Sequence, residues 1–334
     1  MFNSYIKAID YYLPEIKEHN DPEDRMTSKI GILTKNIAGK DEFASDLAYA
    51  AASKLFASGK CHPSEIDFLL YCTQSPEYYL PTTACLLQER LGLSTSCGAL
   101  DINLGCSGYI YGLSLAKGLV EIGMAKNVLL ITADTYSKYI NPLDRSVKLL
   151  FGDAAAATLI SEDDQLNDSG IGPFVFGTDG RGADHLIVPA GGLREPLTTS
   201  SYDEVKDEFG NVRSRSNIYM NGSEIFNFAM KEVPKAVQTL LEKGKSTIED
   251  INYFVFHQAN QYMLESLRRK MSIPKEKFSI QFEDCGNTVS STIPIALIRD
   301  YYEGKVKNGD NVVIVGFGVG YSWGACSIRM NLTD

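Results

Sequence analysis

Cys106 lies in a stretch whose composition suits a reactive thiol. In DINLGCSGYIYGLSLAKG, residues 101–118, it stands between an apolar, strand-like run and a helix-like run of small residues. Gly105 and Gly108 lie close on either side, and glycine permits a tight turn and the close approach of a substrate. A helix start and a nearby imidazole lower a thiol pKa and supply thiolate. We therefore predict a nucleophile, although cysteines are more commonly buried as small hydrophobic residues.

Two polar residues of the C-terminal half could assist that nucleophile. His257 ends the apolar run YFVFH, and among the four histidines it alone joins a strand-like run to a polar turn. Asn287 lies in CGNTVSST, where it could also cap a helix. No spacing among the histidines and cysteines predicts a zinc site. Hydrogen bonding and nucleophilic catalysis are therefore expected, without a metal.

The elements that must position these residues alternate between strand and helix patterns, which predicts α/β layers. Strands are expected at 68–72, 128–134, 154–160, 253–257 and 312–318. Helices are expected at 47–59, after Cys106, at 226–244 and at 259–271. Pro234 is expected to kink or begin a helix, and the polar stretch 198–216 is interpreted as a mobile loop.

A long-period repeat connects the three candidates. SEIDFLLYCTQ (64–74) resembles EDINYFVFHQA (249–259). Leu-Gly-Cys (104–106) and Cys-Gly-Asn (285–287) each precede a predicted helix and then an apolar strand that starts with asparagine. Such self-similarity indicates repeated units. Two halves, 1–168 and 169–334, packed about a pseudo-twofold axis would bring the thiol, imidazole and amide together from equivalent strand ends.

Composition narrows the class of protein. The 334 residues are 44% hydrophobic and 22% charged, as in a globular protein with room for two cores. No apolar run approaches the roughly 20 residues of a membrane span, and the first residues lack the pattern of a signal peptide. The seven cysteines form no CxxC pairs, which favours a reducing, cytoplasmic location. The net charge of −10 argues against nucleic acid as a partner.

Seven motifs in register resemble those of beta-ketoacyl-acyl-carrier-protein synthase III, a family of thiolase-fold condensing enzymes. They are NLGCSGYIYGL, FGDAAAATLI, PAGG, MNGSEIFNFAM, FHQANQ, CGNTVSSTIP and GFGVGYSWG, and together they span nearly the whole chain. The resemblance implies two pseudo-symmetric α/β halves in αβαβα layers. It also implies a catalytic triad of Cys106, His257 and Asn287, the residues that the repeat brings together.

The resemblance further implies a two-step acyl transfer without a cofactor. Cys106 accepts an acyl group from a thioester. A malonyl thioester then loses carbon dioxide while His257 and Asn287 donate hydrogen bonds to its oxygen, and the carbanion attacks the acyl group. In GFGVG, Phe317 is expected to support the histidine and asparagine, and Gly318 and Gly320 to admit the acyl group. Val319 stands where relatives often have glycine. A valine allows the backbone a narrower φ,ψ range at this position than a glycine would.

Substrate contacts are also implied residue by residue. Arg145, in PLDRSV, falls where the family has a nucleotide-contacting arginine. Arg25 stands where the family usually has a tryptophan that stacks on the adenine of coenzyme A, so the donor could be acyl-coenzyme A or an acyl carrier protein. Leu80, in YYLPTTAC, falls where relatives line the partner subunit's acyl pocket, which implies a homodimer.

A basic cluster follows HQAN on the same predicted helix. Tyr262 replaces the basic residue usual near that motif, but Arg268, Arg269 and Lys270 remain. Such a cluster could dock an acidic carrier protein, or it could be a solvated helix end.

Three functions stay open from the sequence. The first is decarboxylative condensation, in fatty acid initiation or a specialised acyl pathway. The second is a thiolase-fold acyltransferase that passes the acyl group to a non-malonyl acceptor. The third is a non-catalytic partner subunit, which retention of all three triad residues disfavours. Gln74 stands near the position of the glutamate base of HMG-CoA synthase-like enzymes, which disfavours that branch, although Glu77 is close by.

Overall fold

The computed structural model describes residues 3–163 and 170–333, and its N-terminal half is built on a five-stranded sheet. The strand order is β1 (Ser4–Tyr12), β7 (Ala154–Glu162), β6 (Asn127–Asp134), β4 (Phe68–Cys72) and β5 (Gly98–Ile102). β4 runs parallel to β5 and β6, whereas β7 is antiparallel to β1 and β6. The central strands are almost wholly buried and apolar because both faces of the sheet are covered.

The C-terminal half repeats this topology in a four-stranded sheet. Its order is β13 (Tyr253–Phe256), β14 (Asn311–Gly318), β15 (Ser322–Arg329) and β8 (Ile171–Thr178). β13 is parallel to β14, and the other pairs are antiparallel, as in β4–β6–β7–β1. A parallel bridge between Phe254 and Phe278 stands where β5 pairs with β4 in the first sheet. The repeat seen in the sequence is therefore present in the topology.

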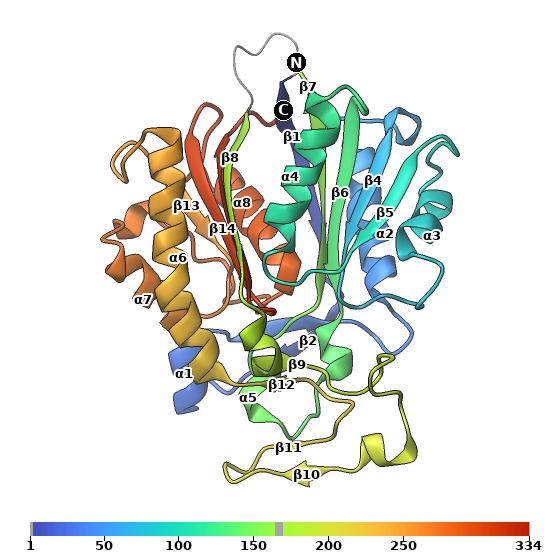
Figure 1. Ribbon diagram of the computed structural model, residues 1–334, viewed down its shortest axis with the longest axis vertical. Coiled ribbons are helices and arrows are strands. Elements are labelled where there is room, and N and C mark those ends of the chain that lie inside the picture. The colour runs from blue at the N-terminus through green and yellow to red at the C-terminus, as the bar shows by residue number, and fades with distance from the viewer. Residues whose placement is uncertain (1–2, 164–169, 334) are drawn as a thin grey trace.

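Helices separate and cover the two sheets (Figure 1). α4 (Gly108–Glu121) and α8 (Thr292–Tyr302) lie between them and share one apolar core with strands of both. α2 (Ala44–Ala57) and α3 (Thr83–Arg90) cover the outer side of the first sheet, and α6 (Gly222–Gly244) and α7 (Gln261–Lys270) that of the second. The expected αβαβα fold is confirmed, and the two central helices begin beside the candidate residues.

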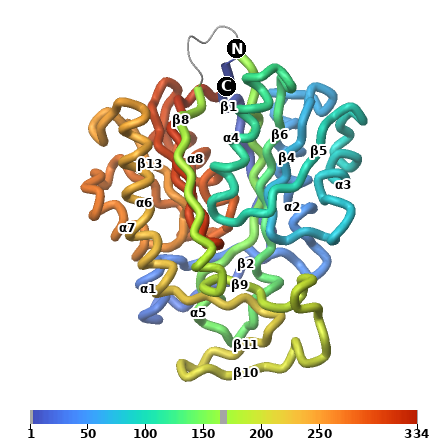
Figure 2. The backbone as a smooth tube through the Cα atoms, in the orientation of Figure 1, coloured from blue at the N-terminus to red at the C-terminus, as the bar shows by residue number. Residues whose placement is uncertain are grey.

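Short elements gather at one end of the molecule, as the tube in Figure 2 shows. They are β2 (Ile16–His19), α1 (Arg25–Ile30), β3 (Thr34–Ile37), α5 (Arg145–Lys148), β9 (Leu186–Ile187), β10 (Val205–Lys206), β11 (Val212–Arg213) and β12 (Tyr219–Met220). The stretch 198–216, interpreted from sequence as a mobile loop, contains a short hairpin in which β10 pairs with β11. Arg213 fastens that hairpin through ion pairs with Asp144 at 2.6 Å and Asp207 at 3.0 Å.

Two further details bear on the sequence interpretation. Pro234 begins no helix but lies inside the 23-residue α6, whose apolar stripe of Ile225, Ala229 and Val233 is buried against the second sheet. Burial of that stripe offsets the backbone hydrogen bond that proline cannot donate. The expected boundary at 168/169 falls outside the described residues. Within those residues, no helix combines the length and apolar character needed to span a membrane.

Candidate active site

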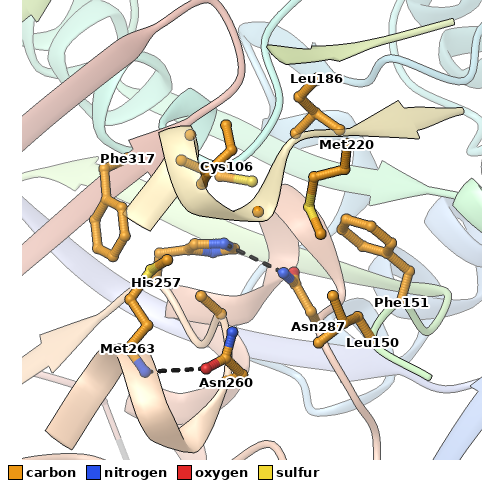
Figure 3. Close-up of a pocket in the computed structure, with 14 residues that line it drawn as sticks. Cys106, Leu150, Phe151, Leu186, Met220, His257, Asn260, Met263, Asn287 and Phe317 are labelled. Carbon is orange, nitrogen blue, oxygen red and sulfur yellow. Dashed lines mark hydrogen bonds between the residues drawn. The ribbon is translucent and has the colours of Figure 1, made fainter. Parts of the chain in front are cut away.

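Cys106, His257 and Asn287 line one small cavity of about 70 Å³ (Figure 3). Cys106 lies between β5 and α4, His257 directly follows β13, and Asn287 lies in the turn before α8. Their exposed fractions are 4%, 2% and 6%, so the cavity is closed on most sides. Hydrophobic side chains and glycines supply most of the remaining wall: Leu150, Phe151, Leu186, Met220, Gly222, Ile225, Ala259, Asn260, Met263, Phe317 and Gly318. The two halves thus deliver a thiol, an imidazole and an amide to one place.

Glycines of β14 let this strand pass against Cys106. A Cβ atom on Gly318 would lie 2.8 Å from Cys106 Cβ and 2.9 Å from Sγ. A Cβ atom on Gly316 would lie 2.8 Å from the Cys106 carbonyl oxygen. All three distances are shorter than normal contacts between such atoms. Ser107 fixes the same turn to β15 through a 2.7 Å hydrogen bond with Ser322.

Burial and, to a smaller extent, the nearby Asp134 carboxylate raise the pKa of the Cys106 thiol to about 12. The backbone N–H groups of Cys106 and Val319 point at the sulfur and lower its pKa. The sequence predicted a depressed pKa for this thiol, whereas the structure gives a raised one, because desolvation is the largest influence on it. The resting thiol is therefore protonated. The two backbone N–H groups beside it can donate hydrogen bonds to a negative charge that develops there.

His257 is a neutral, firmly oriented imidazole. Burial lowers the pKa of its ring to about 3. Phe317 packs edge-to-face against the ring, with centroids 5.5 Å apart, which is the support that the resemblance predicted for this residue. The ring Nδ1 lies 2.7 Å from Thr292 Oγ1. A neutral ring carries one N–H, so it can act as a hydrogen-bond donor at one nitrogen only.

Asn287 is held so that its amide nitrogen faces the histidine. Its backbone N–H donates to the Leu150 carbonyl at 2.9 Å, and its Oδ1 accepts the Val289 N–H at 3.0 Å. Its Nδ2 therefore points into the cavity, 3.5 Å from His257 Nε2 (Figure 3). Two nitrogens at that separation can donate to one oxygen atom placed between them, as an oxyanion site requires.

Hydroxyl groups after Asn287 anchor this turn to β6, and the sequence analysis did not single them out. Ser290 Oγ donates to Asp134 Oδ2 at 2.6 Å, and Ser291 Oγ donates to the Thr132 carbonyl at 2.9 Å. Burial raises the pKa of Asp134 to about 7. The signal available in the sequence was the hydroxyl-rich run SST, which is unusual beside a buried, apolar helix.

The residues expected to contact a nucleotide lie outside this cavity. Arg145 Nη2 bonds Asp24 Oδ1 at 2.8 Å, which joins α5 to the start of α1. Arg25 is exposed on the same short helix. The structure therefore brings the two arginines to adjacent elements, and their contact with substrate stays a prediction.

Leu80 lies on the rim of a second, larger cavity of about 1060 Å³. Its side chain is 83% exposed, and Tyr78 and Tyr79 beside it are 59% and 78% exposed. Val319 and Gly320 line the same cavity, whereas Gly318 lines the small one. The GFGVG loop thus separates the two cavities.

The basic cluster on α7 is only partly available to a partner. Arg268 bonds Glu265 at 2.8 Å and the Ile273 carbonyl at 2.9 Å, so its charge is already paired. Arg269 is exposed and lies 3.5 Å from Glu265. Lys270 lines a surface groove between α6 and α7 together with Lys231 and Lys235, which the sequence analysis did not name. No group of three or more histidine, cysteine, aspartate or glutamate side chains suited to a metal occurs within residues 3–163 and 170–333.

Comparison with known proteins connects this site to one family. Residues 100–180 match the family described as 3-Oxoacyl-[acyl-carrier-protein (ACP)] synthase III, and residues 241–330 match its C-terminal family. The chain is 36% identical to beta-ketoacyl-[acyl-carrier-protein] synthase III of Clostridioides difficile, over 98% of each chain. It is 38% identical to the Clostridium perfringens protein of the same name, over 99% of this chain and 100% of the relative.

A crystal structure of a 3-oxoacyl-(acyl-carrier-protein) synthase III superposes with a TM-score of 0.96. It is 51% identical in sequence, and the alignment covers 98% of this chain and 100% of that one. Sequence and structure comparisons therefore indicate the same family over nearly the full length of this chain.

Proposed function

This chain belongs to the 3-oxoacyl-[acyl-carrier-protein] synthase III family of condensing enzymes, and we propose that Cys106, His257 and Asn287 carry its two half-reactions. The observation that carries the proposal is the convergence of these three buried side chains on one cavity from the two halves of the fold. All three belong to turns that β-strand ends and central helices fix in place.

In the first half-reaction, the Cys106 sulfur attacks the carbonyl carbon of an acyl thioester. The new carbon–sulfur bond forms as the bond to the carrier sulfur breaks, and the thiol proton of Cys106 ends on the departing carrier thiol. The N–H groups of Cys106 and Val319 face the sulfur and can stabilise the oxyanion that develops on the attacked carbonyl. Their support is needed because burial disfavours the free thiolate.

In the second half-reaction, a malonyl thioester binds where the first carrier left. Its carbon–carbon bond to the carboxylate breaks, carbon dioxide leaves, and the electron pair moves toward the thioester oxygen. His257 Nε2–H and Asn287 Nδ2–H donate hydrogen bonds to that oxygen. The carbanion attacks the acyl-Cys106 carbonyl, and the Cys106 sulfur departs as a thiolate that takes up one proton from solvent. Because His257 is neutral, it acts here as a hydrogen-bond donor and gives up no proton.

The preferred partner in this proposal is an acyl carrier protein, which would deliver at least the malonyl group. Lys231 and Lys235 on α6 are 68% and 61% exposed and face the groove that Lys270 also lines. Both lie 3.3 Å from Glu232, so this one carboxylate offsets part of their charge. A positive excess at this groove would steer an acidic carrier and fix its register. Arg25 and Arg145 would contact a nucleotide when coenzyme A is the donor. No step of this chemistry passes through a metal or redox cofactor.

We also propose that the active enzyme is a cytoplasmic homodimer. The exposed aromatic and aliphatic side chains of residues 78–80 rim the larger cavity, and a second copy would remove them from water. All seven cysteines are unpaired thiols, as in a reducing compartment. Sedimentation at micromolar concentration should give the mass of two chains; the mass of one chain would contradict the dimer.

Intact-protein mass spectrometry tests the proposal. Wild type and Cys106→Ala would each be incubated with matched acyl-coenzyme A and acyl-carrier-protein donors, and then with malonyl-carrier protein. The proposal predicts an acyl mass gain only in the wild type, which malonyl-carrier protein discharges as a ketoacyl product. A mass gain that survives in Cys106→Ala would contradict the nucleophile. A gain that malonyl thioester cannot discharge would favour transfer to another acceptor.

A further inference from the structure

The ring of His257 contacts the Thr292 hydroxyl group and the Val289 backbone, and the choice between them bears on the proposed decarboxylation. Thr292, the first residue of α8, is 2% exposed, and its Oγ1 lies 2.7 Å from His257 Nδ1. The same Oγ1 lies 3.0 Å from the carbonyl oxygen of Val289. A hydroxyl group has one proton. It can therefore donate to the ring or to the carbonyl, but not fully to both.

These two choices impose opposite tautomers on the ring. When the Thr292 hydroxyl donates to Nδ1, the single ring proton of His257 resides on Nε2 and points into the cavity. When the hydroxyl donates to Val289, Nδ1 must carry the proton and donate to Oγ1. Nε2 is then a bare lone pair and cannot stabilise an oxyanion. The direction of one hydroxyl thus decides whether the site holds one donor or two.

Three observations favour donation to the ring. The contact with Nδ1, at 2.7 Å, is shorter than the contact with the Val289 carbonyl. Thr292 lies in the first turn of α8, where the positive end of the helix favours a lone pair rather than a proton on a facing atom. Asn287 Nδ2 stands 3.5 Å from Nε2, beyond the usual 2.7–3.2 Å range of an N–H hydrogen bond to an acceptor.

We infer that Thr292 is a positioning residue that donates its hydroxyl to His257 Nδ1 and so keeps the ring proton on Nε2, aimed at the malonyl thioester oxygen. This inference rests on the proposed function for its catalytic consequence, but the tautomer itself is a property of the resting protein.

The turn that carries Thr292 is fastened to the half of the molecule that bears the nucleophile. Ser290 bonds Asp134 and Ser291 bonds Thr132, and both acceptors lie on β6. Between Asn287 and these serines, Val289 has a φ of +55°, a conformation that costs free energy in a β-branched residue. The serine contacts hold the backbone there, and the placement of Thr292 beneath the ring follows.

Nitrogen-15 NMR of histidine-labelled protein reads the tautomer directly, with His257→Gln used to assign the signal. The wild type and Thr292→Ser, which keeps the hydroxyl, should show a protonated Nε2 and a bare Nδ1. Thr292→Val should show the reverse, because the Val289 carbonyl is then free to accept a proton from Nδ1. Ser290→Ala serves as the matched control, since it removes a buried hydroxyl of the same turn that does not touch the ring. The hydrogen bond from Ser291 to the Thr132 carbonyl still holds the turn in this variant, so it should keep the wild-type tautomer.

Kinetics provide the second readout. Thr292→Val should acylate Cys106 at the wild-type rate but decarboxylate malonyl thioester about a hundredfold more slowly, as expected when one oxyanion donor is lost. Thr292→Ser should restore most of that rate. A wild-type ring protonated on Nδ1, or a Thr292→Val ring still protonated on Nε2, would overturn the inference. Absence of condensation by the wild type would instead refute the proposed function, while the NMR spectra would still decide the tautomer.

Discussion

The replacement Gly318→Ala tests the most specific packing feature of the site. A Cβ at this position would stand 2.8 Å from Cys106 Cβ and 2.9 Å from Sγ. Non-bonded heavy atoms prefer about 3.5 Å or more, so the cysteine must move by roughly 0.6 Å. A displacement of about 1 Å at a reacting centre costs on the order of a hundredfold in rate. We therefore expect acylation of Cys106 to slow by about 10- to 100-fold, or about 1.4–2.8 kcal/mol.

The matched control is Gly324→Ala on the neighbouring strand. Its Cβ would lie 2.9 Å from Ile110 Cγ2, so it crowds the same sheet without touching Cys106. Overpacking should cost both variants about 1–3 kcal/mol of unfolding free energy, measured by urea titration. Rapid-quench mass spectrometry would follow acyl-enzyme formation. Equal acylation rates for wild type and Gly318→Ala would refute the packing argument, as would an equal loss in both variants.

The remaining predictions concern charge. The pKa of His257 is depressed to about 3 in the folded protein, so the unfolded chain binds one more proton between about pH 3 and 6.5, and stability falls with acid. Urea titrations give the free energy of unfolding at each pH. In that window its rise with pH should be smaller in His257→Gln than in the wild type, by up to about 1.4 kcal/mol per pH unit; an unchanged slope would contradict the neutral ring. Asp134→Asn removes a charge that raises the pKa of Cys106, so alkylation by iodoacetamide at a pH above the Asp134 pKa of about 7 should accelerate about tenfold, and a slower reaction would contradict the assigned sign. Lys231→Glu with Lys235→Glu should raise KM for malonyl-carrier protein several-fold, more at low salt, but not for malonyl-coenzyme A, whereas equal effects would refute docking at this groove.

The sequence predicted the convergence of the three candidate residues because that convergence depends on chain order. Cys106 and Asn287 precede equivalent central helices, and His257 directly follows β13, the strand equivalent to β4. Once two halves of like topology pack face to face, these positions converge, whatever the details of the surface. The repeat and the alternation of strands and helices therefore predicted most of the fold.

Properties set by tertiary environment could not be predicted in the same way. The pKa of Cys106 depends on how completely the thiol is desolvated, and a local pattern contains no measure of that. The link from Ser290 to Asp134 joins residues 156 positions apart in the chain. The pairing of Arg268 with Glu265 could have been predicted from the sequence, because residues three apart are neighbours on a helix. The hairpin around Asp207 could have been predicted too, since glycine is a typical turn residue. In the structure Gly210 has a φ of +89°.

The central claim is that His257 and Asn287 act in decarboxylation and not in acylation. The most direct measurement is single-turnover release of carbon dioxide from malonyl-carrier protein by pre-acylated wild type, His257→Ala and Asn287→Ala. The account predicts that all three proteins carry the acyl group on Cys106, and that the two variants release carbon dioxide at least about a hundredfold more slowly. Carbon dioxide release at the wild-type rate by either variant, or failure of either to acylate, would contradict it.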